Sequence, residues 1–251
     1  MTNPTRTLRA AAAATALVLV PLRAQAQGAL APSDARFWIG AGVLFGAACA
    51  FDARLSNAAS ENTRTSLNRF ANTLQPLGRA GVDEPVLAAA LVGTWAVGGW
   101  RPAKAVLRIA AGWAAADLLM SGMKPLVGRH RPDSVGGDPW RFRTFARADV
   151  WHSMPSGHTT HVFALAAGVA DEVRVPAVRV AGYAAAALVG WQRIAFRGHW
   201  PSDVVAGAVL GIAASRTTNR LLRRGPLPDT RRRRAQLIVA PGAVFVSAPL
   251  P

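Results

Sequence analysis

The sequence predicts an all-α protein: a membrane-embedded bundle of about six helices that follows an N-terminal segment with the features of a signal sequence. Apolar residues make up 51% of the 251 residues and charged residues only 17%, the balance expected when helices are apolar on most of their faces. Helix-sized apolar segments follow one another from residue 37 to residue 222, without alternating strands, heptads or an internal repeat. No stretch has the composition of a linker, so we expect one domain.

The first 27 residues have the layout of a secretory signal peptide. Arg6 and Arg9 precede an apolar run over residues 10–22, and alanines then flank Gln25 in a small-x-small pattern. We therefore predict that residues 1–27 are a signal peptide, or a signal anchor that stays attached to the protein.

The remaining chain divides into three parts. Residues 28–84 hold an apolar helix over residues 37–51, which is short for a span, and a polar connection with some apolar residues at helical spacing. Residues 85–222 form the helical core, and residues 223–251 form a basic tail that contains prolines. Within the core we predict helices over residues 85–100, 105–123, 159–173, 176–191 and 201–222, with a turn at residues 101–104.

The formal charge of +16 raises the question of nucleic-acid binding. Many of the basic residues, however, lie between Arg216 and Arg234, and a terminal block of this kind is typical of the cytoplasmic flank of a membrane span. We therefore expect a membrane, and no nucleic acid, as a partner. The one cysteine, Cys49, can form no internal disulfide.

Three clusters of polar residues lie in the core. They are Lys124 followed after six residues by Arg131-Pro132; then Pro155-Ser156-Gly157-His158; then Arg193, five residues, His199, three residues and Asp203. Each cluster alone also fits an ordinary role, such as a basic helix end or a helix cap. Together they predict a phosphoryl-transfer site, because that chemistry needs fixed cations, backbone donors, a nucleophile and a proton donor.

The residue types in these clusters suit a phosphate ester. A phosphate monoester carries about two negative charges near neutral pH, and Lys124, Arg131 and Arg193 can supply the matching cations. Ser156 and Gly157 stand just before an apolar helix, so the N–H groups of that helix start are expected to face the anion.

The two histidines of the clusters are candidates for the chemical steps. Asp203 follows His199 by four residues across a helix start, a spacing that lets its carboxylate hold one imidazole nitrogen while the other attacks phosphorus. His158 lies in the other helix start and is expected to give a proton to the departing alcohol.

The clusters resemble the signature of the type 2 phosphatidic acid phosphatase superfamily: Lys, six residues, Arg-Pro; Pro-Ser-Gly-His; and Ser-Arg, five residues, His, three residues, Asp. The resemblance covers about residues 85–222 and departs at Gln192, where the family has serine. It implies a phosphatase without metal or other cofactor, in which His199 becomes a phosphohistidine, His158 protonates the leaving oxygen and Asp203 supports His199.

The resemblance also implies which residues hold the phosphate oxygens, namely Lys124, Arg131, Ser156, Gly157 and Arg193. Gln192 carries two amide N–H donors, so we expect one of them to replace the missing serine hydroxyl. The favoured substrate is a lipid phosphate or an isoprenoid diphosphate. The sequence also leaves open a soluble periplasmic acid phosphatase for small phosphomonoesters, a vanadium-dependent haloperoxidase and a non-catalytic membrane protein.

The basic tail also bears on topology. A cytoplasmic C-terminus puts the start of the last helix, and with it His199, on the periplasmic face of a bacterial inner membrane. If the leader is cleaved, the mature chain begins in the periplasm, and six spans then place the C-terminus in the periplasm and the site on the cytoplasmic face. The conflict is resolved if the leader stays, if a short segment such as residues 37–51 does not cross, or if the bundle is soluble in the periplasm.

Four further polar residues lie outside the family positions. We expect His130, His152 and His161 to lie behind the site or on the surface, with His152 nearest to the pocket. Asp117 stands in an otherwise apolar helix, so we expect it to pair with an arginine such as Arg108 or to face a wet cavity.

Overall fold

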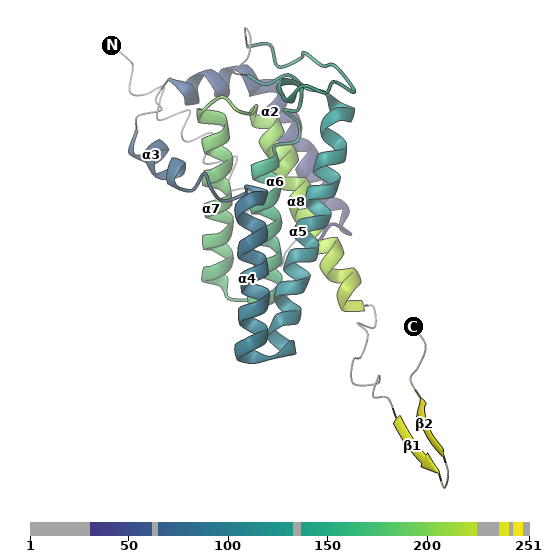
Figure 1. Ribbon diagram of the computed structural model, residues 1–251. Helices are drawn as coiled ribbons and strands as arrows, with labels where there is room; N and C mark the ends of the chain where they lie inside the picture. Colours follow the sequence, from purple (N-terminus) through teal and green to yellow (C-terminus); the bar gives the residue numbers. More distant parts are fainter. Residues whose placement is uncertain (1–30, 62–64, 133–136, 225–235, 241–242, 248–251) are drawn as a thin grey trace. The chain divides into compact units, whose positions relative to one another are not determined.

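A computed structural model describes residues 31–61, 65–132 and 137–224, together with the backbone of residues 236–240 and 243–247. The described residues form seven α-helices, one short 3₁₀ turn and one β-hairpin (Figure 1). The prediction of a helical bundle is therefore confirmed. The predicted signal segment, residues 1–27, and the arginines of residues 231–234 lie outside the described residues.

The long helices run up and down beside one another as a bundle, and one short helix, Ser66–Thr73, lies at its side (Figure 1). In chain order they are α2 (Ala35–Ser60), α3 (Ser66–Thr73), α4 (Ala80–Gly98), α5 (Trp100–Val127), α6 (Gly157–Val173), α7 (Pro176–Ala195) and α8 (Pro201–Arg224), with the 3₁₀ turn η1 at Asp149–Trp151. The end of α5, the start of α6, the end of α7 and the start of α8 consequently meet at one end of the bundle, the upper end in Figure 1.

Helix α2 extends beyond the apolar segment from which it was predicted. We expected a helix over residues 37–51 followed by a polar connection, whereas the observed helix continues to Ser60. Its buried residues are Ala48, Asp52, Ser56 and Ala59, which recur at helical spacing and so share one face. The polar residues continue the helix because Asp52 and Ser56 face the protein interior instead of water.

The predicted turn at residues 101–104 is wrong by a few residues. The chain breaks at Gly99, whose φ of 70° interrupts the helical conformation, and α5 begins at Trp100. Pro102 therefore lies in the first turn of α5. Proline is tolerated there because the first N–H groups of a helix have no intrahelical partner to lose.

The core of the bundle lies between α6, α7 and α8. Val162, Phe163 and Tyr183 pack there with a large share of alanines, and small side chains allow the helices to approach closely. At Gly207 on α8, an added Cβ would lie 2.7 Å from the Ser156 carbonyl oxygen. Glycine at this position thus lets α8 press against the start of α6.

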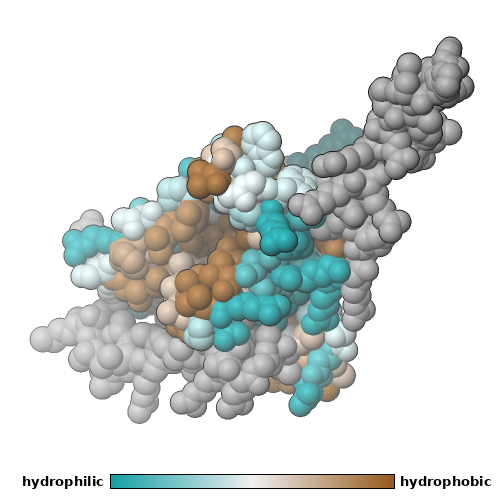
Figure 2. Space-filling view, turned by 90° about the horizontal axis from the view of Figure 1, so that it is seen from below, coloured by the Kyte–Doolittle hydropathy of each residue, from teal (hydrophilic) through white to brown (hydrophobic). Residues whose placement is uncertain are grey.

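Within the described part of the chain, three helices, α2, α4 and α5, are long and apolar enough to cross a membrane. In α4 the only buried residue is Asp83, while Val92, Trp95 and Val97 are exposed. Seen from the end where α4 and α5 join, the described surface includes a broad hydrophobic area beside a hydrophilic one (Figure 2). Exposed apolar helix faces of this extent are suited to a lipid bilayer.

The hairpin is a feature that the predicted helical bundle did not include. Strand β1 (Gln236–Ala240) pairs antiparallel with β2 (Ala243–Ser247). Both segments are rich in β-branched residues, and a Pro-Gly pair stands between them in the sequence, which together are hairpin signals. The chain divides into two compact units, residues 1–219 and 220–251, and every candidate site residue belongs to the first.

Candidate active site

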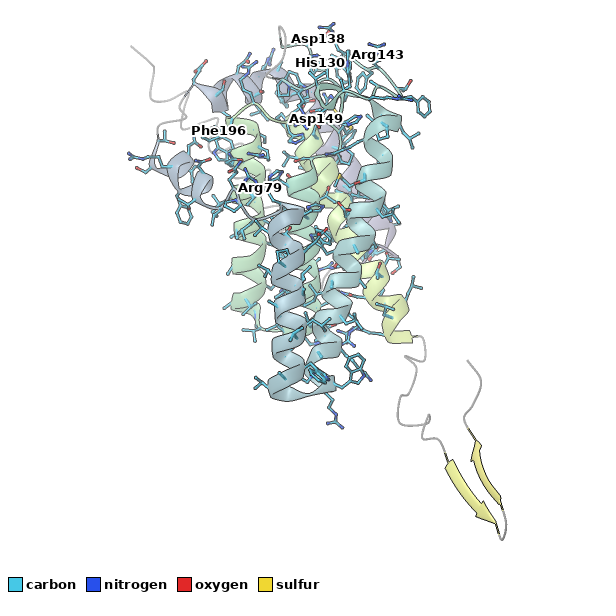
Figure 3. All side chains as sticks on the ribbon, in the orientation of Figure 1. Arg79, His130, Asp138, Arg143, Asp149 and Phe196 are labelled. Carbon is cyan, nitrogen blue, oxygen red and sulfur yellow. The ribbon has the colours of Figure 1, made fainter. Side chains whose placement is uncertain are left out.

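The three sequence clusters come together at the end of the bundle where α5 and α7 end and α6 and α8 begin (Figure 1). Lys124 lies in the last turn of α5, His158 in the first turn of α6 and Asp203 in the first turn of α8. Figure 3 marks neighbouring residues at the same end, among them His130 and Asp149 of the loop between α5 and α6. Segments far apart in the chain thus share one site.

His199 lies in the turn between α7 and α8 and is almost completely buried. Its Nδ1 is 2.7 Å from the carbonyl oxygen of Ser153. Because a carbonyl oxygen only accepts hydrogen bonds, Nδ1 must carry the proton, and the lone pair is on Nε2. Nε2 lies 3.3 Å from Nη1 of Arg131, so the nucleophilic nitrogen faces a candidate phosphate-binding cation.

Asp203 supports His199 less directly than its spacing predicted. Its nearest carboxylate oxygen is 3.8 Å from Nδ1 of His199, beyond hydrogen-bond distance. Instead, Asp203 accepts hydrogen bonds from the Ser153 hydroxyl, from the Trp200 backbone N–H at 2.9 Å and from Arg129 at 2.7 Å. The tautomer of His199 is therefore fixed by the Ser153 carbonyl, and Asp203 holds Ser153 and adds a nearby negative charge.

The environment of His199 favours its neutral form. Burial is the main reason that its pKa lies below the ordinary value; the Asp203 carboxylate opposes this lowering, and the charges of Arg131 and Lys124 reinforce it. At neutral pH the imidazole consequently keeps the free lone pair that a nucleophile needs.

His158 presents a nitrogen with no partner. Its Nε2 is buried and makes no hydrogen bond within the part of the chain that the structure describes. Burial, followed by the charges of Arg193, His199 and Arg79, lowers the pKa of His158 to about 3. A buried unpaired polar atom costs about 1–3 kcal/mol, a cost that an oxygen atom of a bound substrate would remove.

The three cations of the clusters surround these histidines. An added Cβ on Gly157 would lie 3.3 Å from Nζ of Lys124, so glycine lets the ammonium group approach the N-terminus of α6. Arg131 is held by the Gly198 carbonyl at 3.0 Å and by the exposed carboxylate of Asp149 at 3.0 Å. Burial, then the charges of Arg79 and Arg131, lower the pKa of Arg193 to about 10.

Gln192 has contacts that differ from the expected ones. Its amide nitrogen donates to Oδ1 of Asn72 at 3.2 Å, and its carbonyl oxygen accepts from Nε of Arg193 at 2.6 Å. Ser156 is the N-cap of α6, but its side chain does not accept a hydrogen bond from a backbone N–H of that helix. Its hydroxyl oxygen accepts from the Thr159 hydroxyl at 2.9 Å. Gln192 therefore orients Arg193 by its oxygen, and the donation from its other amide N–H to a phosphate oxygen stays a prediction.

Sequence reasoning missed several residues around the site. Arg129 and Ser153 contact Asp203, and Asp52 contacts Arg129 from α2. Asp52 carried one usable signal, since a carboxylate in an apolar helix is a candidate functional residue in its own right. Arg79 at the start of α4 carried no signal, but its charge acts on both His158 and Arg193.

The remaining histidines have other partners. His161 is bonded on both nitrogens, by the Gly78 carbonyl oxygen at 2.9 Å and by Asp117 at 2.8 Å. The expected pairing of Asp117 with Arg108 is therefore wrong, and Arg108 instead binds Glu172 at 2.8 Å. His152 bonds the Ala146 carbonyl and His130 packs edge-on against Trp151, as supporting or surface residues do.

A comparison with protein families decides the classification of this core. The family model described as PAP2 superfamily matches residues 105–225. Residues 105–225 form a PAP2 superfamily domain. The match includes all three clusters, whereas α2, α3 and α4 precede it.

Curated proteins similar to this chain include lipid A 1-phosphatases. The chain is 38% identical over 95 residues to the lipid A 1-phosphatase of Rhizobium johnstonii, which is 38% of this chain and 38% of that protein. It is 39% identical over 100 residues to the lipid A 1-phosphatase of Porphyromonas gingivalis, 19% of that protein. The matched region thus spans well under half the length of these relatives.

Two solved structures share the fold of the PAP2 domain. LpxE of Aquifex aeolicus superposes with a TM-score of 0.55 at 21% identity, covering 68% of this chain and 95% of that one. A transmembrane PAP2-type phosphatidylglycerolphosphate phosphatase of Bacillus subtilis gives a TM-score of 0.56 at 19% identity, covering 75% and 98%. Both matches cover more of this chain than the residues 105–225 that match the family model.

Proposed function

We propose that the protein is a membrane phosphatase that removes a phosphate monoester from a lipid through a phosphohistidine on His199. The observation that carries the proposal is the orientation of His199, whose Nδ1 is bound to the Ser153 carbonyl while Nε2 faces Arg131. The match of residues 105–225 to the PAP2 superfamily supports the same reaction class.

The first chemical step is an attack on phosphorus. The Nε2 lone pair of His199 forms the N–P bond as the bond between phosphorus and the ester oxygen breaks. His158, which acquires a proton when the anion binds, donates it to the departing oxygen, so that a neutral alcohol leaves. Lys124, Arg131 and Arg193 neutralise the charge on the three equatorial oxygens, with further donors at the start of α6.

The second step hydrolyses the phosphohistidine. His158, now neutral, takes a proton from a water molecule as that water attacks phosphorus and the N–P bond breaks. Inorganic phosphate leaves, His158 then releases the proton taken from water, and both imidazoles are again neutral as in the free protein. Asp203 remains ionised throughout and stabilises the positive charge on the phosphorylated ring.

A lipid substrate is supported by the surface of the protein. The candidate spans α2 and α5 end near the site, so a phosphorylated head group at the bilayer surface can reach it. Because the similar curated proteins are lipid A 1-phosphatases, a lipid A-type 1-phosphate is the first substrate to test. Phosphatidylglycerol phosphate is the second, followed by an isoprenoid diphosphate.

The same reasoning bears on orientation. Helix α8 ends in a segment with Arg216, Arg220 and Arg223, whereas the site lies at its start. The positive-inside tendency places the arginine-rich end in the cytoplasm. We infer that the site opens toward the periplasm of a bacterial inner membrane.

The decisive experiment measures phosphate release by the purified, detergent-solubilised protein from lipid A, phosphatidylglycerol phosphate, undecaprenyl diphosphate, phosphatidic acid and a soluble aryl phosphate. Turnover of a lipid substrate is expected, with a labelled acid-labile phosphoenzyme that is lost in His199→Ala. Turnover of aryl phosphate alone, by protein that stays soluble without detergent, would support the periplasmic acid phosphatase instead.

Two additions to that experiment distinguish a phosphatase from a haloperoxidase and from a non-catalytic protein. A chelator is expected to leave the rate unchanged, because the charges facing the phosphate are supplied by lysine and arginine side chains. Vanadate is expected to inhibit, since it is a tetrahedral oxyanion like phosphate. Vanadate-dependent halide oxidation would indicate a haloperoxidase, and the absence of any phosphate release would indicate a non-catalytic protein.

A further inference from the structure

Arg129 lies between Lys124 and Arg131 in the chain, yet its guanidinium is used inside the protein. The side chain is 1% exposed, and each of its nitrogens has a protein partner. Nη1 donates to Asp203 at 2.7 Å and to the Ser202 hydroxyl at 2.6 Å, Nη2 donates to Asp52 at 2.6 Å, and Nε donates to the Pro139 carbonyl at 2.9 Å. Arg129 therefore acts on its neighbours in the protein rather than on a substrate oxygen.

Asp52 completes this network from α2. One carboxylate oxygen accepts from the Ser202 backbone N–H at 2.8 Å, and the other accepts from the Ser202 hydroxyl at 2.6 Å as well as from Arg129. Asp52 and Asp203 are both fully buried. The network thus joins α2 to the first turn of α8 through one guanidinium shared by two carboxylates.

We propose that Asp52 and Arg129 are positioning residues that act on the nucleophile, so that α2 is part of the catalytic apparatus although it lies outside the PAP2 domain. The connection is continuous: Asp52 binds Arg129, Arg129 binds Asp203, Asp203 binds the Ser153 hydroxyl, and the Ser153 carbonyl binds Nδ1 of His199. This inference rests on the proposed function and deepens it by naming what orients His199.

The charges in the network explain why an arginine is needed. Two buried carboxylates without a cation between them would repel each other, and one would take up a proton. Arg129 balances one negative charge, and the other remains available to stabilise His199 when phosphorylation makes its ring positive. Asp52 fixes the second half of the guanidinium, which prevents Arg129 from rotating away from Asp203.

A second contact between α2 and the site supports the same role. Nη1 of Arg197 donates to Oδ1 of Asn57 on α2 at 3.0 Å, and Nη2 donates to the Pro132 carbonyl at 3.2 Å. Arg197 stands two residues before His199 and has a positive φ of 54°. Helix α2 therefore contacts the His199 turn on the Arg197 side as well as through Ser202.

The test compares Asp52→Asn with the matched control Glu172→Gln. Both changes neutralise a buried carboxylate paired with an arginine, but Glu172 lies near the far end of α6 and pairs with Arg108. For Asp52→Asn we expect kcat for phosphate release to fall by about 10- to 100-fold, the usual effect of disturbing residues that orient a functional group. The Kd for vanadate should stay unchanged, because Lys124, Arg131 and Arg193 are untouched.

Two more variants keep the test decisive if Asp52→Asn folds poorly. Ser202→Ala removes only the bridging hydroxyl and should lower kcat in the same direction by a smaller factor. Arg129→Lys keeps the charge but loses the planar guanidinium that donates to both carboxylates. In the double variant with Asp52→Asn, the fold-decrease in kcat should be smaller than the product of the two single decreases, since both residues act through one network.

Three outcomes are distinguishable. If the native protein releases no phosphate, the proposed function fails. If the native protein is active and Asp52→Asn matches Glu172→Gln in kcat, the positioning role is wrong. If Asp52→Asn weakens vanadate binding as much as it lowers kcat, then α2 acts only as a general structural support, and the inference is overturned.

Discussion

Two buried histidines, His161 and His199, both lie beside a carboxylate, and they differ in the use of the second nitrogen. His161 is bonded on one side by the Gly78 carbonyl and on the other by Asp117, so neither nitrogen is directed at a site. His199 donates from Nδ1 to the Ser153 carbonyl, and its Nε2 lies 3.3 Å from Nη1 of Arg131, a candidate phosphate-binding cation. Proximity to a carboxylate therefore does not distinguish the candidate catalytic histidine from a structural one. The partner of Nε2 does: it is a carboxylate for His161 and a candidate phosphate-binding arginine for His199.

His158 strengthens this contrast because it lies one turn before His161 on the same helix. Its Nε2 is buried without a partner among the described residues. Of these two histidines on α6, one thus ties the helix to its neighbours, and the other presents an unsatisfied nitrogen. The comparison leads to four predictions, given from the largest expected effect to the smallest.

The largest effect is expected for His199→Ala. Without Nε2 there is no group to form the N–P bond, so phosphate release should fall by at least about 10³-fold and the labelled phosphoenzyme should disappear. Phosphate release from a lipid substrate is the measurement, with vanadate binding as the control for folding. Full activity in this variant would refute the assignment of the nucleophile.

A smaller loss is expected for His158→Ala. Removing a general acid costs about 10²- to 10⁴-fold when the leaving group is a poorly acidic alcohol. With an aryl phosphate, whose leaving oxygen needs little protonation, the phosphoenzyme should still form at a rate closer to that of the native protein. Equal losses on alkyl and aryl substrates would show that His158 does not protonate the leaving group.

The uptake of a proton on anion binding provides a third test. In the free protein the pKa of His158 is about 3, so this imidazole is neutral at neutral pH. A bound phosphate dianion stabilises the imidazolium, which raises the pKa and draws in a proton. Calorimetry in buffers of different ionisation enthalpy should therefore show proton uptake when inorganic phosphate binds. His158→Ala should abolish this uptake, and its persistence would assign the proton to another group.

The smallest effect on turnover is expected for His161→Leu. This change leaves Asp117 without its partner and removes the bond to Gly78, which should lower the free energy of unfolding by about 1–3 kcal/mol. The kcat of the folded fraction should remain near the native value, because no nitrogen of His161 faces the site. Thermal unfolding in detergent and active-site titration with vanadate separate the two effects, and a large fall in kcat would contradict the comparison.

Much of the fold and of the candidate site was predictable because its signals are local. Apolar segments of helical length predict the bundle, and the clusters around Lys124, Ser156 and His199 occur at spacings that phosphate chemistry needs. The ends of elements were less predictable. The extension of α2 to Ser60 depends on Asp52 and Ser56 being buried by residues elsewhere in the chain.

The roles within the site were predicted less well than its members. Spacing predicted that Asp203 would hold His199, yet the nearest acceptor is the Ser153 carbonyl, 46 residues away in sequence. Likewise the contacts of Gln192 with Asn72 and Arg193 were not predicted, and its donation to phosphate stays a prediction. In both cases several groups could satisfy the same hydrogen-bonding potential, and spacing alone does not choose among them.

By itself the sequence determined the helical class, the membrane character and the residue types gathered for an oxyanion, since hydropathy and composition act over short stretches of chain. Only the tertiary structure decided which groups contact the nitrogens of each histidine and that α2 reaches Asp203 through Arg129. The contacts of Asp52 with Arg129 and Ser202 join residues 77 and 150 positions apart. Pairings over such distances depend on how the helices pack, and packing is a property of the whole chain.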